Sequence, residues 1–289
     1  MKRIFSLFTA ICISLAISGC SKTPTGNFVT ATTLPVYEIA SALCDGTDIT
    51  VQRLVSENVS CLHDYTLQVS QMQMIESASA IIVTGAGFEN FLDDVISAEK
   101  TVIDASQNIH YLSIDTHNAH EHEHATDPHI WLAPENAMVM TDNILNGLIA
   151  LFPQHANIMQ KNYEVWSNQL HELAAFAQAE LVDLQSKQII TFHDGFVYLA
   201  NGYGLEIIHS MEEESGSEAS AAELIEIIKL VQDNNISAIF TEKNGSDAAA
   251  KIISAETGAK IHQLDMAISG DSYIDAMYEN IRTLKEALE

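Results

Sequence analysis

Short apolar runs alternate with longer stretches of helical periodicity along most of the chain. The apolar runs have the length of buried parallel strands and cover residues 28–32, 49–55, 80–84 and 101–104. The helical patterns between them cover residues 33–44, 66–77 and 88–98. Strands that alternate with helices indicate βα units around a parallel sheet, so this part of the chain is predicted to form one βα lobe.

The middle of the chain breaks this rhythm. Residues 135–152 are helical in pattern, and residues 155–185 contain neither glycine nor proline. A helix of that second length would span about 46 Å, which is enough to join two lobes. The βα rhythm then returns, with strands expected at 187–191, 205–208, 236–241 and 260–264 and helices at 219–234, 246–257 and 272–288.

These patterns predict an α/β fold with two βα lobes of mainly parallel sheets, joined by a long rigid α-helix. We expect an N-terminal lobe at 28–153, the linking helix at 154–186 and a C-terminal lobe at 187–289.

The first residues have the features of a secretory signal. A positive start, Met1-Lys2-Arg3, precedes an apolar stretch at 4–17 that is shorter than the roughly 20 residues of a spanning helix. Ile17-Ser18-Gly19-Cys20 resembles the bacterial lipobox, which implies cleavage after residues 1–19, a diacylglycerol on Cys20 and a polar tether at 20–27. The alternative is an ordinary cut near Gly19 that leaves Cys20 as a free thiol. We expect an extracytoplasmic protein, lipid-anchored to the bacterial cell membrane.

Charge and cysteine content narrow the function further. The formal net charge is −26, with 13 Lys and Arg against 39 Asp and Glu, which argues against nucleic acid and suits cations. Of four cysteines, Cys44 and Cys61 remain unassigned, and an oxidising compartment favours a disulfide between them. The alternative is that Cys61 is a thiolate metal ligand beside His63.

Four residues stand where a metal site is expected. His63 follows the strand at 49–55, His193 follows the strand at 187–191, and Asp265 follows the strand at 260–264. Ligands in open α/β sheets bind beyond the carboxyl ends of the strands. His129 lies in a turn that Pro128 would fix. Three imidazoles and one carboxylate suit four-coordinate Zn²⁺, whereas Mn²⁺ favours more oxygen ligands.

A second group of histidines lies in a polar, low-complexity loop. It consists of His117, His120, His122 and His124. Such composition favours weak metal capture, and the alternative is a solvated loop without a site. The loop also matches H-E-x-x-H, but a metalloprotease needs that motif on a regular helix.

Several of these motifs resemble those of the zinc- and manganese-binding lipoprotein receptors of bacterial ABC importers. The matching stretches are Thr33 to Tyr37, His63 to Tyr65, Asp127 to Pro134, His193 to Phe196 with Tyr203 to Glu206, and Leu264-Asp265 with Tyr273 and Asn280. The resemblance covers nearly the whole mature chain and implies two βα lobes, a linking helix and a metal cleft between them. A histidine at position 193 resembles the zinc branch.

Two departures from that family leave the ligand set open. Leu62 replaces the usual proline before the first histidine, where a Cys44–Cys61 bridge would hold the loop instead. Asp265-Met266-Ala267 stands where Asp-Pro-Leu is common, so Glu242 is kept as a reserve ligand or as an acceptor behind a ligand.

The resemblance implies a monomeric receptor, not an enzyme, that captures Zn²⁺ and delivers it to a membrane permease. A manganese or iron receptor of the same family is the nearest alternative. A secreted zinc hydrolase is the alternative from another class, and it would need an open metal position and a general base.

Overall fold

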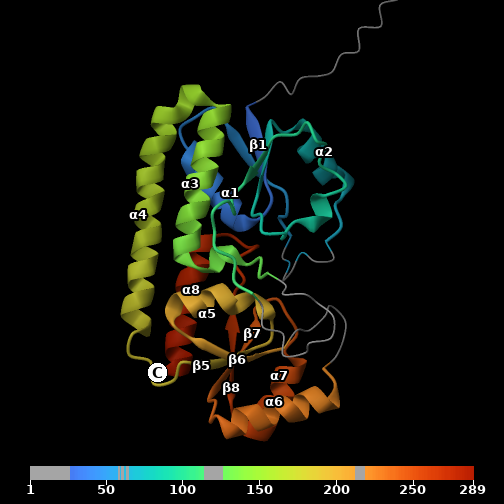
Figure 1. The fold of residues 1–289 in the computed structure, drawn as a ribbon, viewed down its shortest axis with the longest axis vertical. Coiled ribbons are helices and arrows are strands. Elements are labelled where there is room, and N and C mark those ends of the chain that lie inside the picture. The colour runs from blue at the N-terminus through green and yellow to red at the C-terminus, as the bar shows by residue number, and fades with distance from the viewer. Residues whose placement is uncertain (1–26, 58, 60–61, 63–64, 114–125, 212–218) are drawn as a thin grey trace, which may run out of the picture.

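The chain forms two βα lobes that a long helix connects along one side (Figure 1). The structure, a computed structural model, describes residues 27–289 apart from 58, 60–61, 63–64, 114–125 and 212–218. The expected signal sequence, and with it Cys20, therefore lies outside the described residues. None of the helices in the described ranges is both long and apolar enough to cross a membrane.

The N-terminal lobe is built on a parallel sheet of four strands in the order β2-β1-β3-β4. Its strands are β1 (Phe28–Ala31), β2 (Thr50–Arg53), β3 (Ala80–Val83) and β4 (Val102–Asp104). Its helical elements are α1 (Leu34–Cys44), α2 (Val69–Ser77) and the 3₁₀ turn η1 (Asn90–Leu92). β3 is apolar throughout because it lies between two strands and is covered on both faces.

The C-terminal lobe repeats this plan, with a parallel sheet in the order β6-β5-β7-β8. Its strands are β5 (Gln188–Thr191), β6 (Glu206–Ser210), β7 (Ala238–Glu242) and β8 (Lys260–Leu264). Its helical elements are η4 (Asp194–Phe196), α5 (Val197–Tyr203), α6 (Ala221–Asp233), α7 (Ala248–Thr257) and α8 (Tyr273–Leu288).

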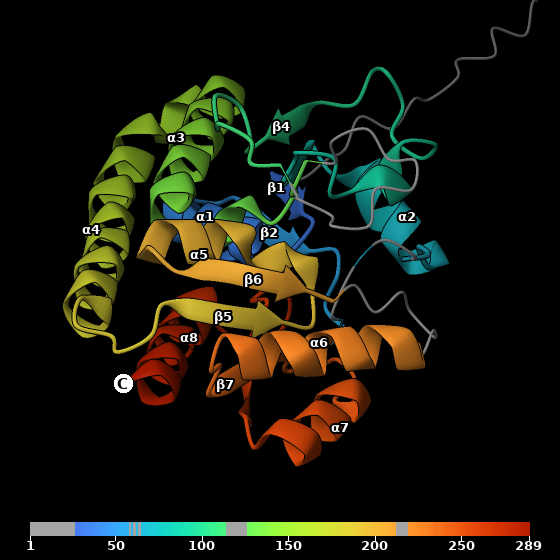
Figure 2. The same cartoon turned by 60° about the horizontal axis from the view of Figure 1, so that its bottom comes forward.

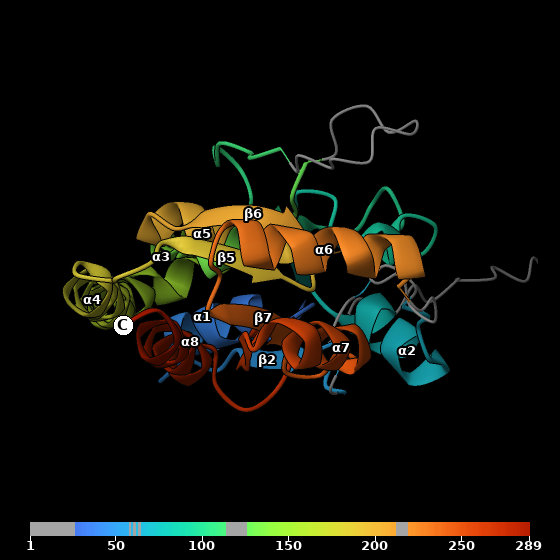
Figure 3. The same ribbon diagram turned by 90° about the horizontal axis from the view of Figure 1, so that it is seen from below.

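Between the sheets the chain forms η2 (Ile130–Leu132), α3 (Pro134–Leu151), η3 (Pro153–His155) and α4 (Ala156–Leu181). The 26 residues of α4 span about 39 Å. Apolar side chains at helical spacing form its buried stripe: Met159, Trp166, Leu170, Leu173, Ala177 and Leu181. This stripe lets α4 pack against α1 and α3 in one lobe and α8 in the other. Figures 2 and 3 show α4 and α8 on one flank of the molecule and α2 on the opposite flank.

One hydrophobic core runs through both lobes. It contains Val29 and Ile82 from the first sheet, Leu170 from α4, and Phe240 and Leu284 from the C-terminal lobe. Two smaller clusters flank it, one under α6 and α7 and the other between α2 and η1. The predicted fold class, two βα lobes joined by a long helix, is confirmed.

Two elements differ from the sequence prediction. The segment 88–98 was expected to be a helix, but it forms turns around η1. Phe88 packs in the main core while Leu92 packs in the cluster beside α2, and one helical face cannot point in both directions. The short helix α5 was not predicted; it ends at Gly204, whose φ of 67° suits glycine.

The structure shows Cys44 as a free cysteine, and the Cys44–Cys61 bridge stays a prediction. The predicted partner, Cys61, lies outside the described residues. Cys44 is the last residue of α1, and its side chain packs in the main core with 4% exposed. Burial raises the pKa of its thiol to about 12, so Cys44 behaves as a small apolar side chain.

Cys44 should therefore react with thiol reagents only after unfolding. At pH 8 the raised thiol pKa leaves almost no thiolate, and the core excludes the reagent. We expect mass spectrometry of the unreduced protein to show labelling of Cys44 in denaturant and not in native buffer. If Cys44 stays unlabelled in denaturant until a reductant is added, it is disulfide-bonded, and the prediction of a free thiol is wrong.

Candidate metal site

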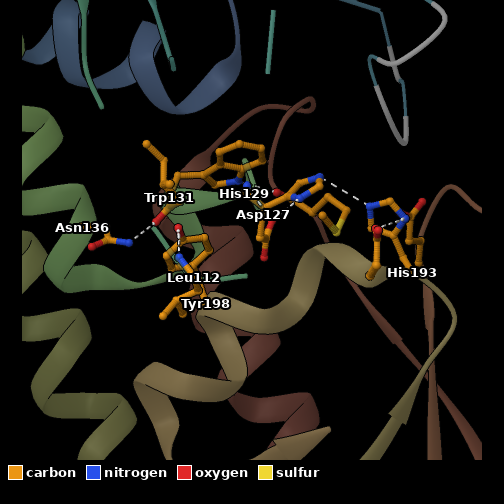
Figure 4. Close-up of polar contacts among 11 residues, drawn as sticks. Leu112, Asp127, His129, Trp131, Asn136, His193 and Tyr198 are labelled. Carbon is orange, nitrogen blue, oxygen red and sulfur yellow. Dashed lines mark hydrogen bonds and ion pairs between the residues drawn. The ribbon is translucent and has the colours of Figure 1, made fainter. Parts of the chain in front are cut away.

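His129 is held by the residues that precede it in the chain. Asp127 Oδ1 accepts the backbone N–H of His129 at 2.8 Å and lies 2.7 Å from His129 Nδ1. Both residues are buried, and Pro128 between them limits the backbone. The carboxylate fixes the ring through Nδ1, which leaves Nε2 to point away from it (Figure 4).

Aromatic packing fixes the plane of the His129 ring. Phe88, from the loop after β3, and Trp131, from η2, have ring centroids 5.4 and 5.3 Å from the ring centroid of His129. Trp131 Nε1 donates to the carbonyl of Met266 at 2.7 Å, and the Tyr273 hydroxyl donates to the carbonyl of Trp131 at 2.7 Å. The second histidine of the sequence prediction is thus tied to both lobes.

A glycine provides the space for this ring. A Cβ atom on Gly195 would lie 2.7 Å from two atoms of the His129 ring and 2.7 Å from Met266 Cε. Any larger residue would therefore push the ring out of place. The sequence pattern alone did not identify this requirement, because it depends on two segments 66 residues apart that meet only in the fold.

His193 lies just beyond the carboxyl end of β5 and is also backed by a carboxylate. Its Nδ1 lies 3.1 Å from Glu242 Oε1, at the end of the neighbouring strand β7. Asp194 Oδ1 is farther from this nitrogen, at 3.8 Å. Glu242 has only 7% of its surface exposed, so the contact is shielded from water. The reserve role of Glu242 as an acceptor behind a histidine fits this geometry better than the role of a ligand.

The two imidazoles face each other through their other nitrogens. His129 Nε2 and His193 Nε2 are 3.4 Å apart, and the two rings are inclined by 85° (Figure 4). Two nitrogens that bind one tetrahedral Zn²⁺ at 2.0–2.1 Å are about 3.3–3.4 Å apart. Histidine ligands of zinc usually have their second ring nitrogen on a carboxylate or carbonyl. The pair therefore fits two nitrogen ligands of a divalent metal ion.

Asp265 does not join these imidazoles in the structure. Its Oδ2 pairs with Lys243 Nζ at 3.0 Å, and its Oδ1 accepts the backbone N–H of Ala267 at 2.8 Å. No group of three His, Cys, Asp or Glu side chains in the described part of the chain is placed to hold a metal ion. His63 and the loop with His117, His120, His122 and His124 lie outside the described residues.

Asp127 was missed as a functional residue by the sequence reasoning, which named Glu242 as an acceptor. Its signal was present, because an acid two residues before a histidine in Asp-Pro-His can reach the ring of that histidine. Its Oδ2 atom is buried and has no hydrogen-bond partner among the described residues. A buried carboxylate is costly without a positive group beside it, which suits a site for a cation.

Comparisons with known proteins identify the family of the chain. The profile of the family described as ZnuA, zinc-uptake complex component A, periplasmic, matches residues 29–287. The zinc-binding lipoprotein AdcA of Streptococcus pneumoniae is 28% identical over 311 residues, which cover all of this chain and 62% of that protein. The zinc-binding protein AdcA of Streptococcus pyogenes serotype M3 is also 28% identical, over 89% of this chain and 55% of that protein. The chain thus spans less than two thirds of the length of these relatives.

Solved structures show the same fold. A crystal structure of ZnuA superimposes with a TM-score of 0.80 at 25% identity and covers 91% of this chain and 100% of that chain. A structure of FpvC from Pseudomonas aeruginosa, in complex with Mn²⁺, has a TM-score of 0.81 at 24% identity and covers 90% and 98%. With a family profile that matches residues 29–287, the protein belongs to the ZnuA family of periplasmic zinc-uptake components, the family that its motifs resemble.

Proposed function

We propose that this protein captures a divalent metal ion, Zn²⁺ before others, outside the cytoplasm and delivers it to the membrane permease of an ABC importer. The observation that carries the proposal is the pair of Nε2 atoms 3.4 Å apart, each on a ring that a carboxylate orients. The names of the AdcA relatives, which refer to zinc, support this cargo.

In this proposal His129 and His193 bind the ion through Nε2, and His63 and Asp265 complete the set that the sequence predicts. Asp127 and Glu242 orient the two central rings and raise their basicity. Four protein ligands suit binding and release. The protein would therefore bind the ion and pass it on without changing it chemically.

Mn²⁺ is the alternative cargo, because solved structures of similar fold contain Mn²⁺ or Ni²⁺. Two central imidazoles favour Zn²⁺, since Mn²⁺ prefers carboxylate and water oxygens.

We further propose that the protein acts as a monomer, anchored to the membrane by lipid on Cys20. The shared core and the length of α4 hold the two lobes in one arrangement. Release of the ion would then depend on movement of the ligand-bearing loops more than on wide closure of the lobes.

Removal of a central imidazole should abolish tight binding. We expect calorimetric titration of the metal-stripped soluble form, residues 21–289, to show one tight Zn²⁺ site and weaker Mn²⁺ binding. His193→Ala should lose at least about 100-fold in Zn²⁺ affinity, because a nitrogen that binds the ion is gone. The control is His171→Ala, an exposed histidine of α4, which should bind as the unaltered protein does. Tighter Mn²⁺ than Zn²⁺ would change the cargo, and no tight site for either ion would refute the proposal.

Glu242→Gln separates an orienting role from a ligand role. An amide still accepts a hydrogen bond from Nδ1 but lacks the charge that polarises the ring, so Zn²⁺ affinity should fall about 10–100-fold. Glu206→Gln, which removes one exposed carboxylate of the same lobe, is the matched control and should have little effect. A loss as large as that of His193→Ala would instead identify Glu242 as a ligand.

Gly195→Ala tests the space beside His129. The added methyl group would meet the ring at 2.7 Å, so the ring must move and Zn²⁺ affinity should fall about 10-fold or more. In Gly202→Ala, on the neighbouring helix α5, the new Cβ would meet its nearest atom at 3.7 Å, an ordinary contact. We expect Gly202→Ala to retain affinity in the same titration; equal affinity in both variants would show that Gly195 does not position the ring.

A further inference from the structure

Lys243 and Asp265 are brought together by the pairing of two adjacent parallel strands. They are the first residues after β7 and β8, whose last residues, Glu242 and Leu264, lie in register. The backbone N–H of Lys243 donates to the carbonyl of Leu264 at 2.9 Å. This register places the side chain of Lys243 beside that of Asp265, with Nζ 3.0 Å from Oδ2.

The backbone of Asp265 is fixed more firmly than its carboxylate. The buried side chain of Asn280, on α8, accepts the backbone N–H of Asp265 at 2.7 Å and donates to its carbonyl at 2.7 Å. The carboxylate is shared between the Ala267 N–H, an internal contact of its own turn, and the ammonium of Lys243, whose side chain is 63% exposed. A metal ion that used Asp265 as a ligand would therefore have to replace Lys243.

We propose that Lys243 competes with the cargo ion for the Asp265 carboxylate. The site is thereby biased toward metal ions that the imidazoles can hold without help from this carboxylate. This inference rests on the proposed function and adds a residue that determines which metal is retained. Lys243 acts through Asp265 and needs no contact with the ion.

The bias follows from the ligand preferences of the metals. The free energy needed to separate Asp265 from Lys243 is the same for every ion. Zn²⁺ binds well to imidazole, so the three histidines keep most of its affinity when Lys243 holds Asp265, the fourth ligand of the proposed set. Mn²⁺ depends more on carboxylate oxygen, so it cannot avoid that cost. Exposed ion pairs are weak, which limits the bias to a moderate factor.

The test is Lys243→Met in the metal-stripped soluble form, with Zn²⁺ and Mn²⁺ titrated separately. Mn²⁺ affinity should rise about three- to fivefold and Zn²⁺ affinity less than about twofold, because the ion pair contributes little more than this factor. Lys243→Arg keeps the ion pair and should keep the original ratio of the two affinities.

The matched control is Lys251→Met. Lys251 is an exposed lysine of the same lobe and pairs with Asp247 at 2.7 Å, so this variant removes the same charge and a similar ion pair. It should leave the ratio of Mn²⁺ to Zn²⁺ affinity unchanged. A further variant, Lys243→Met combined with Asp265→Asn, should show no gain in Mn²⁺ affinity over Asp265→Asn alone.

The outcomes separate this inference from the function on which it rests. If the unaltered protein binds neither ion tightly, the proposed function fails, and this inference with it. If the protein binds Zn²⁺ tightly but Lys243→Met leaves the affinity ratio unchanged, or Lys251→Met shifts it equally, only the inference on Lys243 is refuted.

Discussion

The close approach of two imidazoles, the buried ring of His129 and the partly buried ring of His193, is the constraint on which the site depends. His129 comes from the segment that links the lobes and His193 from the end of a C-terminal strand, yet their Nε2 atoms are 3.4 Å apart. Each ring is held from behind by a carboxylate, Asp127 or Glu242. Because these contacts fix both Nδ1 atoms, both Nε2 atoms are directed to the same point. The packing around the rings has to keep both Nε2 atoms directed at that point.

This requirement explains two local features of the fold. Gly195 is present because the ring of His129 occupies the volume of its missing side chain. Phe88 leaves a helical pattern so that its ring can pack on His129 and Trp131. In both positions the local backbone follows the site, and the intrinsic preference of the segment is overridden.

Sequence patterns predicted the fold class, because apolar runs mark parallel strands. They named His193 as a candidate ligand because ligands lie beyond the carboxyl ends of such strands, and His129 because Pro128 would fix its turn. The patterns left Glu242 undecided between ligand and acceptor, since only the fold shows that it contacts Nδ1 of His193. They also placed Asp265 at a strand end without its partner, because Lys243 is brought to it by strand register. The segment 88–98 was wrongly predicted to be a helix, because periodicity does not tell which of two hydrophobic clusters a side chain enters.

The core shared by the two lobes has a consequence for how the chain folds. Apolar side chains of α4 lie in the same cluster as residues of both sheets, so neither lobe encloses a complete interior by itself. The lobes resemble each other in topology, yet each exposes a large apolar surface when the other is removed. The pair should therefore fold and unfold as one cooperative unit, and neither half is an autonomous domain.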